Sequence, residues 1–285
     1  MCLCAWLTYF PAWPCQVVLD GPSQQIVYSA LSQILADERR GLVTDLVSED
    51  ESKLATDALM SHLLVLAAGS NQLGLPPHRL LLPGACTTAE GTPVECGMRG
   101  LRSTVSPCTM RTLDRIAARR NVTLNSILLG TLATQLRAHS GQDQFAINQT
   151  YLGRRPDQMR AVGSYSGFVA MEFTLDDGSS LLSTCQHAFT ETMRNMAASD
   201  RAVANAALLS NVAYELNDVR PIPRPSLSHF SSKFVLCDLF FLVNEFVDGF
   251  TAEITYDVSK FEDAYAETLL KDWLLVLEQL DDLEG

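Results

Sequence analysis

The sequence is poor in positive charge. It has 21 Lys and Arg against 33 Asp and Glu, so its formal net charge is −12. Nucleic-acid binding depends on clustered Lys and Arg that displace counterions, so this balance argues against a nucleic-acid partner. The basic cluster from Arg111 to Arg120 also contains Asp114 and is typical of a solvated helix face.

Long apolar runs are missing as well. No window reaches the roughly 18 continuous apolar residues of a membrane span. The apolar start from Met1 to Trp13 has no Lys or Arg before Arg39, and Pro11 interrupts it, so it does not fit a signal peptide. We therefore expect a soluble, cytoplasmic protein that does not bind membranes.

Paired metal-binding cysteines are a third absence. The 8 Cys show no C-x-x-C spacing, which argues against zinc and redox sites and favours reduced, structural thiols. The chain has 285 residues, of which 47% are hydrophobic and 19% charged, so it can bury the core of one or two domains.

Apolar periodicity predicts a mixture of helices and strands. We expect helices over 23–37, 51–68, 106–120, 123–140, 179–198, 201–214 and 261–280, and strands over 92–105, 145–151, 167–175, 233–245 and 250–258. The strand 233–245 is almost continuously apolar, as expected of a central strand buried on both faces. The strand 250–258 alternates like a half-exposed one, and Asp248-Gly249 suits the hairpin turn between them. A mixed sheet with helices predicts an α/β fold, or an α+β sandwich.

One segment carries a recognisable motif. Cys15-Gln16 is followed by three apolar residues and then by Asp20-Gly21, directly before the first predicted helix. This layout resembles the His-His-x-x-x-Asp-Gly signature of condensation domains of nonribosomal peptide synthetases and related chloramphenicol-acetyltransferase-like acyltransferases. The resemblance places Gln16 where the second His acts as general base, with Asp20 and Gly21 shaping the loop.

Later segments resemble the same family in the same order. Ser140-Gly141-Gln142-Asp143 is similar to its helix-ending turn, and Gly153-Arg154 to its Gly-Arg at a strand end. The stretch from Gly163 to Val169, which contains Tyr165, Ser166 and Gly167, is similar to its Gly-x-Phe-Val-Asn-Thr segment, although Ala170-Met171 replaces the Asn-Thr. The stretch 247–261 is similar to its closing hairpin and helix.

The resemblance implies a domain organisation. It identifies residues 1–22 as a remnant of the N-terminal lobe with the motif loop, 23–91 as a helical connection, and 92–285 as the C-terminal lobe of a condensation-like domain. Almost all of the N-terminal lobe is missing from this chain.

The resemblance also implies a reaction, acyl or peptidyl transfer from a thioester to an amine or hydroxyl. Both substrates would be held on phosphopantetheine arms of carrier protein domains, with no metal or other bound cofactor. A separate N-terminal lobe or self-association would complete the structure.

The chemistry of Gln16 argues against full activity. An amide has no lone pair basic enough to take a proton at neutral pH, and losing a positioned base typically costs about 10²–10⁴-fold in rate. Gln16 can still orient an amine by accepting its hydrogen bond. Asp20 and Arg154 form an ion pair in the family, although Asp20-Gly21 alone also suits a simple turn before a helix.

Other assignments stay open. Cys15 could be a nucleophile, but no His lies near it in the sequence, and a buried apolar thiol explains it more simply. Tyr165, Ser166 and Gly167 suit either the wall of a substrate tunnel or a glycine-rich entry into a strand. Two functions follow: an acyltransferase impaired at Gln16, or a catalytically inactive interaction module that docks carrier or partner proteins.

Overall fold

The computed structural model describes residues 79–83, 97–152, 166–197, 210–218, 237–246 and 249–280. The chain divides into two compact units: residues 1–73 with 151–167, and residues 74–150 with 168–285. The described residues belong almost entirely to the second unit. The predicted boundaries at 22 and 91 lie outside the described residues, as do the predicted helices 23–37 and 51–68.

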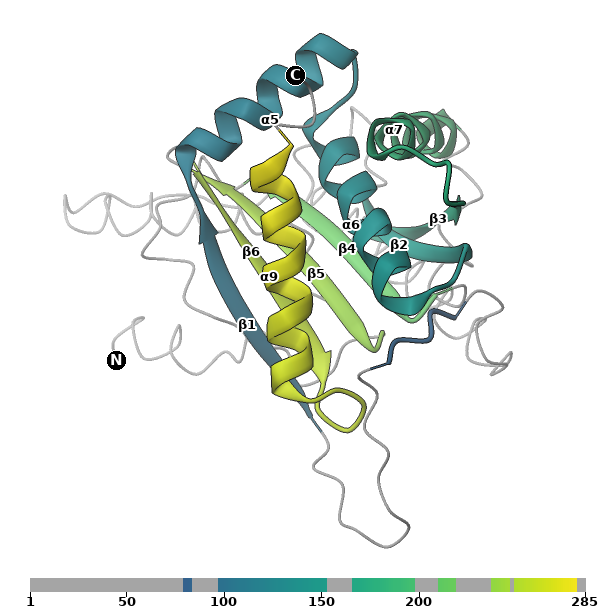
Figure 1. The fold of residues 1–285 in the computed structure, drawn as a ribbon, viewed down its shortest axis with the longest axis vertical. Coiled ribbons are helices and arrows are strands. Elements are labelled where there is room, and N and C mark those ends of the chain that lie inside the picture. The colour runs from purple at the N-terminus through teal and green to yellow at the C-terminus, as the bar shows by residue number, and fades with distance from the viewer. Residues whose placement is uncertain are drawn as a thin grey trace, which may run out of the picture. The chain divides into compact units, whose positions relative to one another are not determined.

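The second unit is built on a mixed six-stranded sheet (Figure 1), in the order β1-β6-β5-β4-β2-β3. The strands are β1 (Met98–Val105), β2 (Gln144–Leu152), β3 (Ser166–Thr174), β4 (Val212–Asp218), β5 (Leu239–Phe246) and β6 (Gly249–Asp257). β1 and β5 each pair antiparallel with β6, whereas β5, β4 and β2 run parallel. The predicted α/β fold is confirmed.

The described helices cover one face of this sheet. They are α5 (Pro107–Arg120), α6 (Leu124–Ser140), α7 (Leu181–Ala197) and α9 (Asp263–Gln279). In Figure 1, α9 crosses in front of β5 and β6, and α6 lies between α9 and α7. The Trp273 ring of α9 meets the Phe241 ring of β5 edge-on, with centroids 5.7 Å apart, and Trp273 is fully buried. The core therefore lies between the helices and this sheet face.

Local sequence signals set the helix ends. Ser106 caps α5 by accepting a hydrogen bond from the Thr109 amide at 3.1 Å, ahead of Pro107. Thr123 caps α6 through the Ser126 amide in the same way, at 3.1 Å. Gly141 ends α6 with a φ of 68°, a left-handed conformation that glycine adopts without strain. These helices agree with the prediction to within a residue or two.

α6 and α7 pack closely because residue 130 is a glycine. A Cβ atom built on Gly130 would lie 2.7 Å from Cα and 2.8 Å from Sγ of Cys185 on α7. Real Cβ atoms do not approach a backbone this closely. Gly130 therefore allows the two helix backbones to touch.

Three predictions need correction, one of a helix and two of strand burial. The prediction of a helix over 201–214 is wrong for residues 212–214, which begin β4. β5 alternates buried and partly exposed residues, whereas β6 is buried along nearly its whole length, the reverse of what was expected. β6 lies between β1 and β5, and its polar residues Thr251, Glu253 and Thr255 are buried as well as its apolar ones.

Candidate functional site

Most of the predicted site residues lie outside the described residues. This applies to Gln16, Asp20, Gly21, Arg154 and Tyr165, as it does to Cys15. Ser166 and Gly167 are the first two residues of β3. β2 ends at Leu152, two residues before Arg154, and is the neighbour of β3 in the sheet. The structure therefore describes the strand that precedes Arg154 in the sequence and the strand that follows Tyr165, and the pairing of Asp20 with Arg154 stays a prediction.

The two described histidines make structural contacts. The His139 Nε2 atom lies 3.1 Å from Oδ2 of Asp272, and its ring meets that of Tyr265 edge-on at 5.8 Å. His187 hydrogen-bonds the Glu172 carbonyl at 2.8 Å. Both rings tie one element to another.

The sheet face opposite the helices carries polar residues from four strands. We call this surface the polar sheet face: Asn148 and Thr150 on β2, Glu215 and Asn217 on β4, Asn244 on β5, and Thr251 and Glu253 on β6. Strand register places them together. Asn217 pairs with Asn244, which pairs with Thr251, and Glu215 reaches Glu253 through Leu242. Their strand neighbours, such as Tyr214, point to the core.

Glu215 is the central carboxylate of the polar sheet face. Thr150 Oγ1 donates a hydrogen bond to Glu215 Oε2 at 3.2 Å. Burial raises the pKa of the Glu215 carboxyl above its ordinary value, and hydrogen bonds from Thr150 and Asn217 oppose that rise. Glu215 can therefore hold or accept a proton nearer to neutral pH than an exposed glutamate can.

Two acceptor atoms on the same face are buried without a partner. Asn148 is 2% exposed and its Nδ2 atom donates to the Ser210 carbonyl at 2.9 Å, but its Oδ1 atom has no hydrogen-bond partner among the described residues. Thr251 Oγ1 is likewise buried without a hydrogen-bond partner in the described part of the chain. Buried polar atoms are nearly always paired, so these two need an explanation.

Arg102 and Glu253 form an ion pair on the same face. Arg102 on β1 donates to Glu253 Oε2 through its Nε atom at 2.9 Å and its Nη2 atom at 2.6 Å. The carboxylate of Glu253 is thereby neutralised in place. Glu215 has hydroxyl and amide donors instead of a guanidinium.

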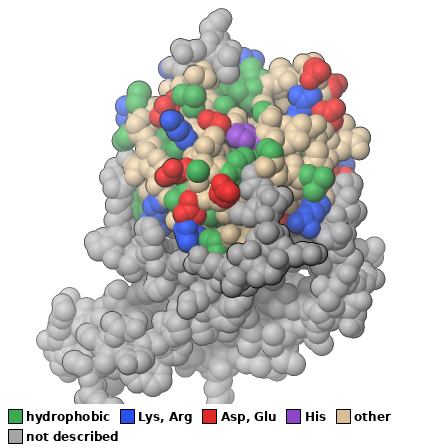
Figure 2. Space-filling model, turned by 60° about the horizontal axis from the view of Figure 1, so that its bottom comes forward, with side chains coloured by type: hydrophobic (Ala, Val, Ile, Leu, Met, Phe, Trp, Pro, Cys, Tyr) green, Lys and Arg blue, Asp and Glu red, His purple; other side chains and the backbone are tan. Residues whose placement is uncertain are grey.

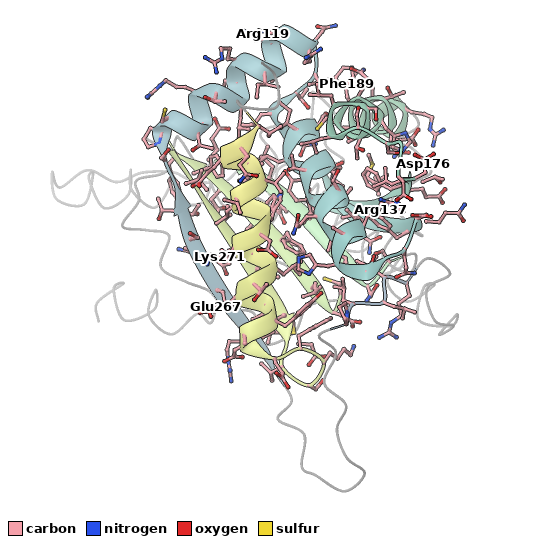
Figure 3. All side chains as sticks on the ribbon, in the orientation of Figure 1. Arg119, Arg137, Asp176, Phe189, Glu267 and Lys271 are labelled. Carbon is pink, nitrogen blue, oxygen red and sulfur yellow. The ribbon has the colours of Figure 1, made fainter. Side chains whose placement is uncertain are left out.

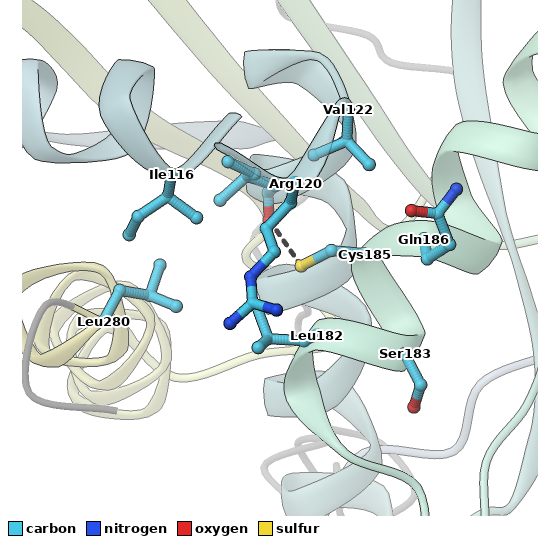
Figure 4. A pocket seen from close by; sticks show the side chains of 9 residues that line it. Ile116, Arg120, Val122, Leu182, Ser183, Cys185, Gln186 and Leu280 are labelled. Atoms are coloured by element: carbon cyan, nitrogen blue, oxygen red, sulfur yellow. Dashed lines mark hydrogen bonds between the residues drawn. The ribbon is translucent and has the colours of Figure 1, made fainter. Parts of the chain in front are cut away.

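A cavity of about 370 Å³ opens between the helices (Figure 4). Its walls include Ile116, Ile127, Leu182 and Leu280, with Arg120 beside them. Cys185 also lines it, but burial raises the pKa of that thiol to about 12, so it is not a reactive thiolate. Ser183 and Gln186 also line the cavity, so its walls are both apolar and polar.

A buried polar cluster secures the segment 79–83 to the sheet. Asn211 accepts from the Leu80 amide at 2.8 Å and donates to the Leu80 carbonyl at 3.1 Å. Asp238 accepts from Asn211 at 3.0 Å and from Arg79 at 3.1 Å, and it also pairs with Lys260. Asn211, Arg79 and Lys260 all donate to the Asp238 carboxylate, which indicates that Asp238 has a structural role.

The visible face of the described residues carries no single dominant charge (Figure 2). Figure 2 shows acidic, basic and apolar side chains interspersed on one face of the described part. Within the described ranges there is no group of three or more His, Cys, Asp or Glu that could hold a metal ion. In the same part of the chain, no helix has both the length and the hydropathy to cross a membrane.

Sequence reasoning missed the polar sheet face. Its signal was the alternation in Val212–Asp218, where the polar Glu215 and Asn217 stand two residues apart. The helix predicted over 201–214 hid this strand period. Asn148 and Thr150 were inside a correctly predicted strand, but nothing in the sequence shows which strand lies next to it.

Comparisons with known proteins identify the fold. No protein-family model matches the sequence, and no curated protein matches it significantly. Among solved structures, the condensation domain of the monacolin K polyketide synthase MokA is similar, with 12% identity and a TM-score of 0.68 over 91% of this chain and 66% of that one. The EpoB cyclization-docking bidomain from Sorangium cellulosum has 14% identity and a TM-score of 0.68, over 92% of this chain and 58% of that one.

A third similar structure is the X-domain in its complex with OxyB from teicoplanin biosynthesis. It has 15% identity and a TM-score of 0.66, over 95% of this chain and 66% of that one. The chain thus spans 58% to 66% of the length of these three solved chains. The sheet, its helices and these similarities together show that the chain has the fold of the condensation-type domains of nonribosomal peptide and polyketide synthases.

Proposed function

We propose that this chain is a condensation-domain-like protein of nonribosomal peptide biosynthesis. It would transfer an acyl or peptidyl group from a carrier-bound thioester to an amine or hydroxyl, at a rate lowered by Gln16. The observation that carries the proposal is the similarity of more than nine-tenths of the chain to a condensation domain and to a cyclization-docking bidomain. The motif from Cys15 to Gly21 supports the assignment of the reactive loop.

The proposal gives each motif residue a role. Gln16 accepts a hydrogen bond from the attacking group without removing its proton, because an amide is not a base at neutral pH. Asp20 and Gly21 shape the loop, and Arg154 pairs with Asp20. Tyr165, Ser166 and Gly167 line the path of the substrate.

The partners follow from the chemistry. Thioester substrates of this class are delivered on phosphopantetheine arms, so carrier protein domains are the expected partners. The EpoB bidomain is a piece of such a synthetase. A separately supplied N-terminal lobe, or a second copy of the chain, would complete the structure.

The test restores the base. The variant Cys15→His/Gln16→His, supplied with an N-terminal lobe and with carrier-loaded donor and acceptor, should condense about 10²-fold faster or more than the unmodified chain. Cys15→Asn/Gln16→Asn is the matched control, since it changes the same positions without adding a base. Equal rates for both variants would contradict the role given to residue 16.

The second candidate is a catalytically inactive interaction module. The observation in its favour is that an X-domain with a similar fold forms a complex with OxyB. On this reading the unmodified chain binds a carrier domain or partner protein, and the His-His variant binds it equally well but stays silent in the condensation assay. Binding by calorimetry and product formation by mass spectrometry, run on the same samples, separate the two functions.

A further inference from the structure

The polar sheet face is built to receive a hydrogen-bond donor. Its unsatisfied atoms, Asn148 Oδ1 and Thr251 Oγ1, can both accept, and Asn148 is 2% exposed with its amide nitrogen already used. An anion would meet the Glu215 carboxylate and these oxygens, and would be repelled. A group with hydrogen-bond donors, such as an amine, satisfies these oxygen atoms.

Glu215 and Asn148 lie on adjacent strands, offset by two residues on the same sheet face. Asn148 on β2 pairs with Ala213 on β4, so Glu215 is two residues further along the same face, level with Thr150. The Thr150 hydroxyl and Asn217 bind the carboxylate and fix its orientation. Glu215 is partly exposed, which leaves it able to accept another donor.

Strand register places Glu215 in the interior of the sheet. β2, β4 and β5 are parallel, and Glu215 is the central residue of β4, level with a residue two positions before the end of β2. The other charged residues of the polar sheet face, Glu253 and its partner Arg102, are already paired with each other.

We propose that the polar sheet face binds the amine of the acceptor substrate, with Glu215 as its counter-charge and proton acceptor and Asn148 Oδ1 as its second hydrogen-bond partner. This rests on the proposed function and narrows it to amide formation. A hydroxyl has one proton and no charge, whereas an amine or ammonium group can satisfy Glu215 and Asn148 together.

The proposed step is balanced in atoms and electrons. The bound ammonium first gives one proton to the Glu215 carboxylate. The neutral amine nitrogen then attacks the thioester carbonyl carbon, so the C–N bond forms and the C–S bond breaks, and the second nitrogen proton passes to the departing thiolate. Because burial raises the pKa of Glu215, it is a better match for this transfer than an exposed glutamate.

The experiment uses the full chain with ¹³C-labelled glutamate carboxylates. The Glu215 signal is assigned by its loss in Glu215→Gln, and its titration is followed with S-(2-aminoethyl)-N-acetylcysteamine, a small amine probe. The hydroxyl analogue S-(2-hydroxyethyl)-N-acetylcysteamine is the matched control probe. We expect the amine to lower the titration midpoint of Glu215, since a neighbouring cation favours the carboxylate, and the hydroxyl probe to leave it nearly unchanged.

Two variants sharpen the result. Glu215→Gln should bind the amine probe about tenfold more weakly or worse, because it loses a charge-assisted hydrogen bond. Glu267→Gln changes an exposed glutamate that projects from α9 on the other side of the sheet (Figure 3), and should bind like the unmodified chain. Glu215→Asp also removes the labelled glutamate signal, so it assigns the titration of the unmodified chain even if Glu215→Gln folds poorly.

The failures of the two proposals look different. An unmoved Glu215 midpoint with the amine probe, together with unchanged condensation by Glu215→Gln in the His-restored background, overturns the amine site and leaves the proposed function standing. A shifted midpoint with no condensation by any variant supports the amine site and removes the transferase function.

Discussion

Asn211→Ala should destabilise the second unit more than any surface change near it. The Asn211 side chain makes the two hydrogen bonds that a neighbouring strand would make with Leu80. Its Oδ1 atom accepts from the Leu80 amide and its Nδ2 atom donates to the Leu80 carbonyl. The same Nδ2 atom also donates to Asp238. Leu80 and Leu82 are buried, at 2% and 6% exposure. The buried part of the segment is thus held by hydrogen bonds to Asn211 and by the packing of two leucines.

The variant has two ways to respond, and their costs bound the effect. If Leu80 stays in place, two buried main-chain groups lose their partners, at about 1–3 kcal/mol each. If the segment detaches, Leu80 and Leu82 become exposed, at about 1.5–3 kcal/mol each. The cheaper route determines the result, so we expect a loss of about 2–5 kcal/mol in the free energy of unfolding.

Urea unfolding of the full chain measures this change, with hydrogen exchange at the Leu80 amide as a local readout. The matched control is Gln142→Ala, which removes contacts to the exposed Leu81 amide at 2.5 Å and the Arg79 carbonyl at 3.4 Å. Because water replaces these partners, we expect a loss below about 1 kcal/mol. A variant Asn211→Ala as stable as the control, with an unchanged Leu80 amide, would refute the reasoning.

Three further predictions concern the core and the polar sheet face. Gly130→Ala forces a Cβ against the Cys185 backbone and should cost about 1–3 kcal/mol in a thermal or urea unfolding series, and Cys185→Ala should not rescue it because backbone contacts remain. Trp273→Phe loses the hydrogen bond from Nε1 to Thr131 Oγ1 at 3.1 Å and ring volume, for a loss of about 2–3 kcal/mol in the same assay. The pKa of Glu215 is raised in the folded state, so Glu215 binds more protons there than in the unfolded state. The free energy of unfolding should therefore fall as the pH rises above about 4.5. Glu215→Gln should flatten this fall in unfolding experiments from about pH 4 to 8.

The sequence was informative where local rules decide the structure. Ser106-Pro107 and Thr123 mark helix starts, Gly141 marks a helix end, and each acts through its own neighbours in the chain. These signals predicted α5 and α6 closely. The order of strands depends on distant contacts, so it could not be read in the same way.

The reversed burial of β5 and β6 shows this limit. The apolar run in 233–245 indicated a strand covered on both faces, but β5 alternates, and it is β6, with Thr251 and Glu253, that is buried throughout. Glu253 tolerates burial because Arg102 of β1 neutralises it, and β1 lies about 150 residues earlier. Local hydrophobicity cannot reveal such a partner.

In the candidate site too, local signals could be read from the sequence and distant contacts could not. A contiguous motif drew attention to Gln16 and Asp20, whereas the pairing of Thr150 with Glu215 joins residues 65 positions apart. That pairing exists only because β2 and β4 are neighbours in the sheet. Because a helix was predicted over 201–214, β4 was not predicted as a strand.

The most direct test of the central claim is a single-turnover comparison of Cys15→His/Gln16→His with Cys15→Asn/Gln16→Asn, using carrier-loaded substrates and a supplied N-terminal lobe. We predict amide product from the His-His variant at a rate about 10²-fold or more above that of the Asn-Asn variant. Indistinguishable product formation by the two proteins would contradict the assignment of residue 16 to the position of the missing base.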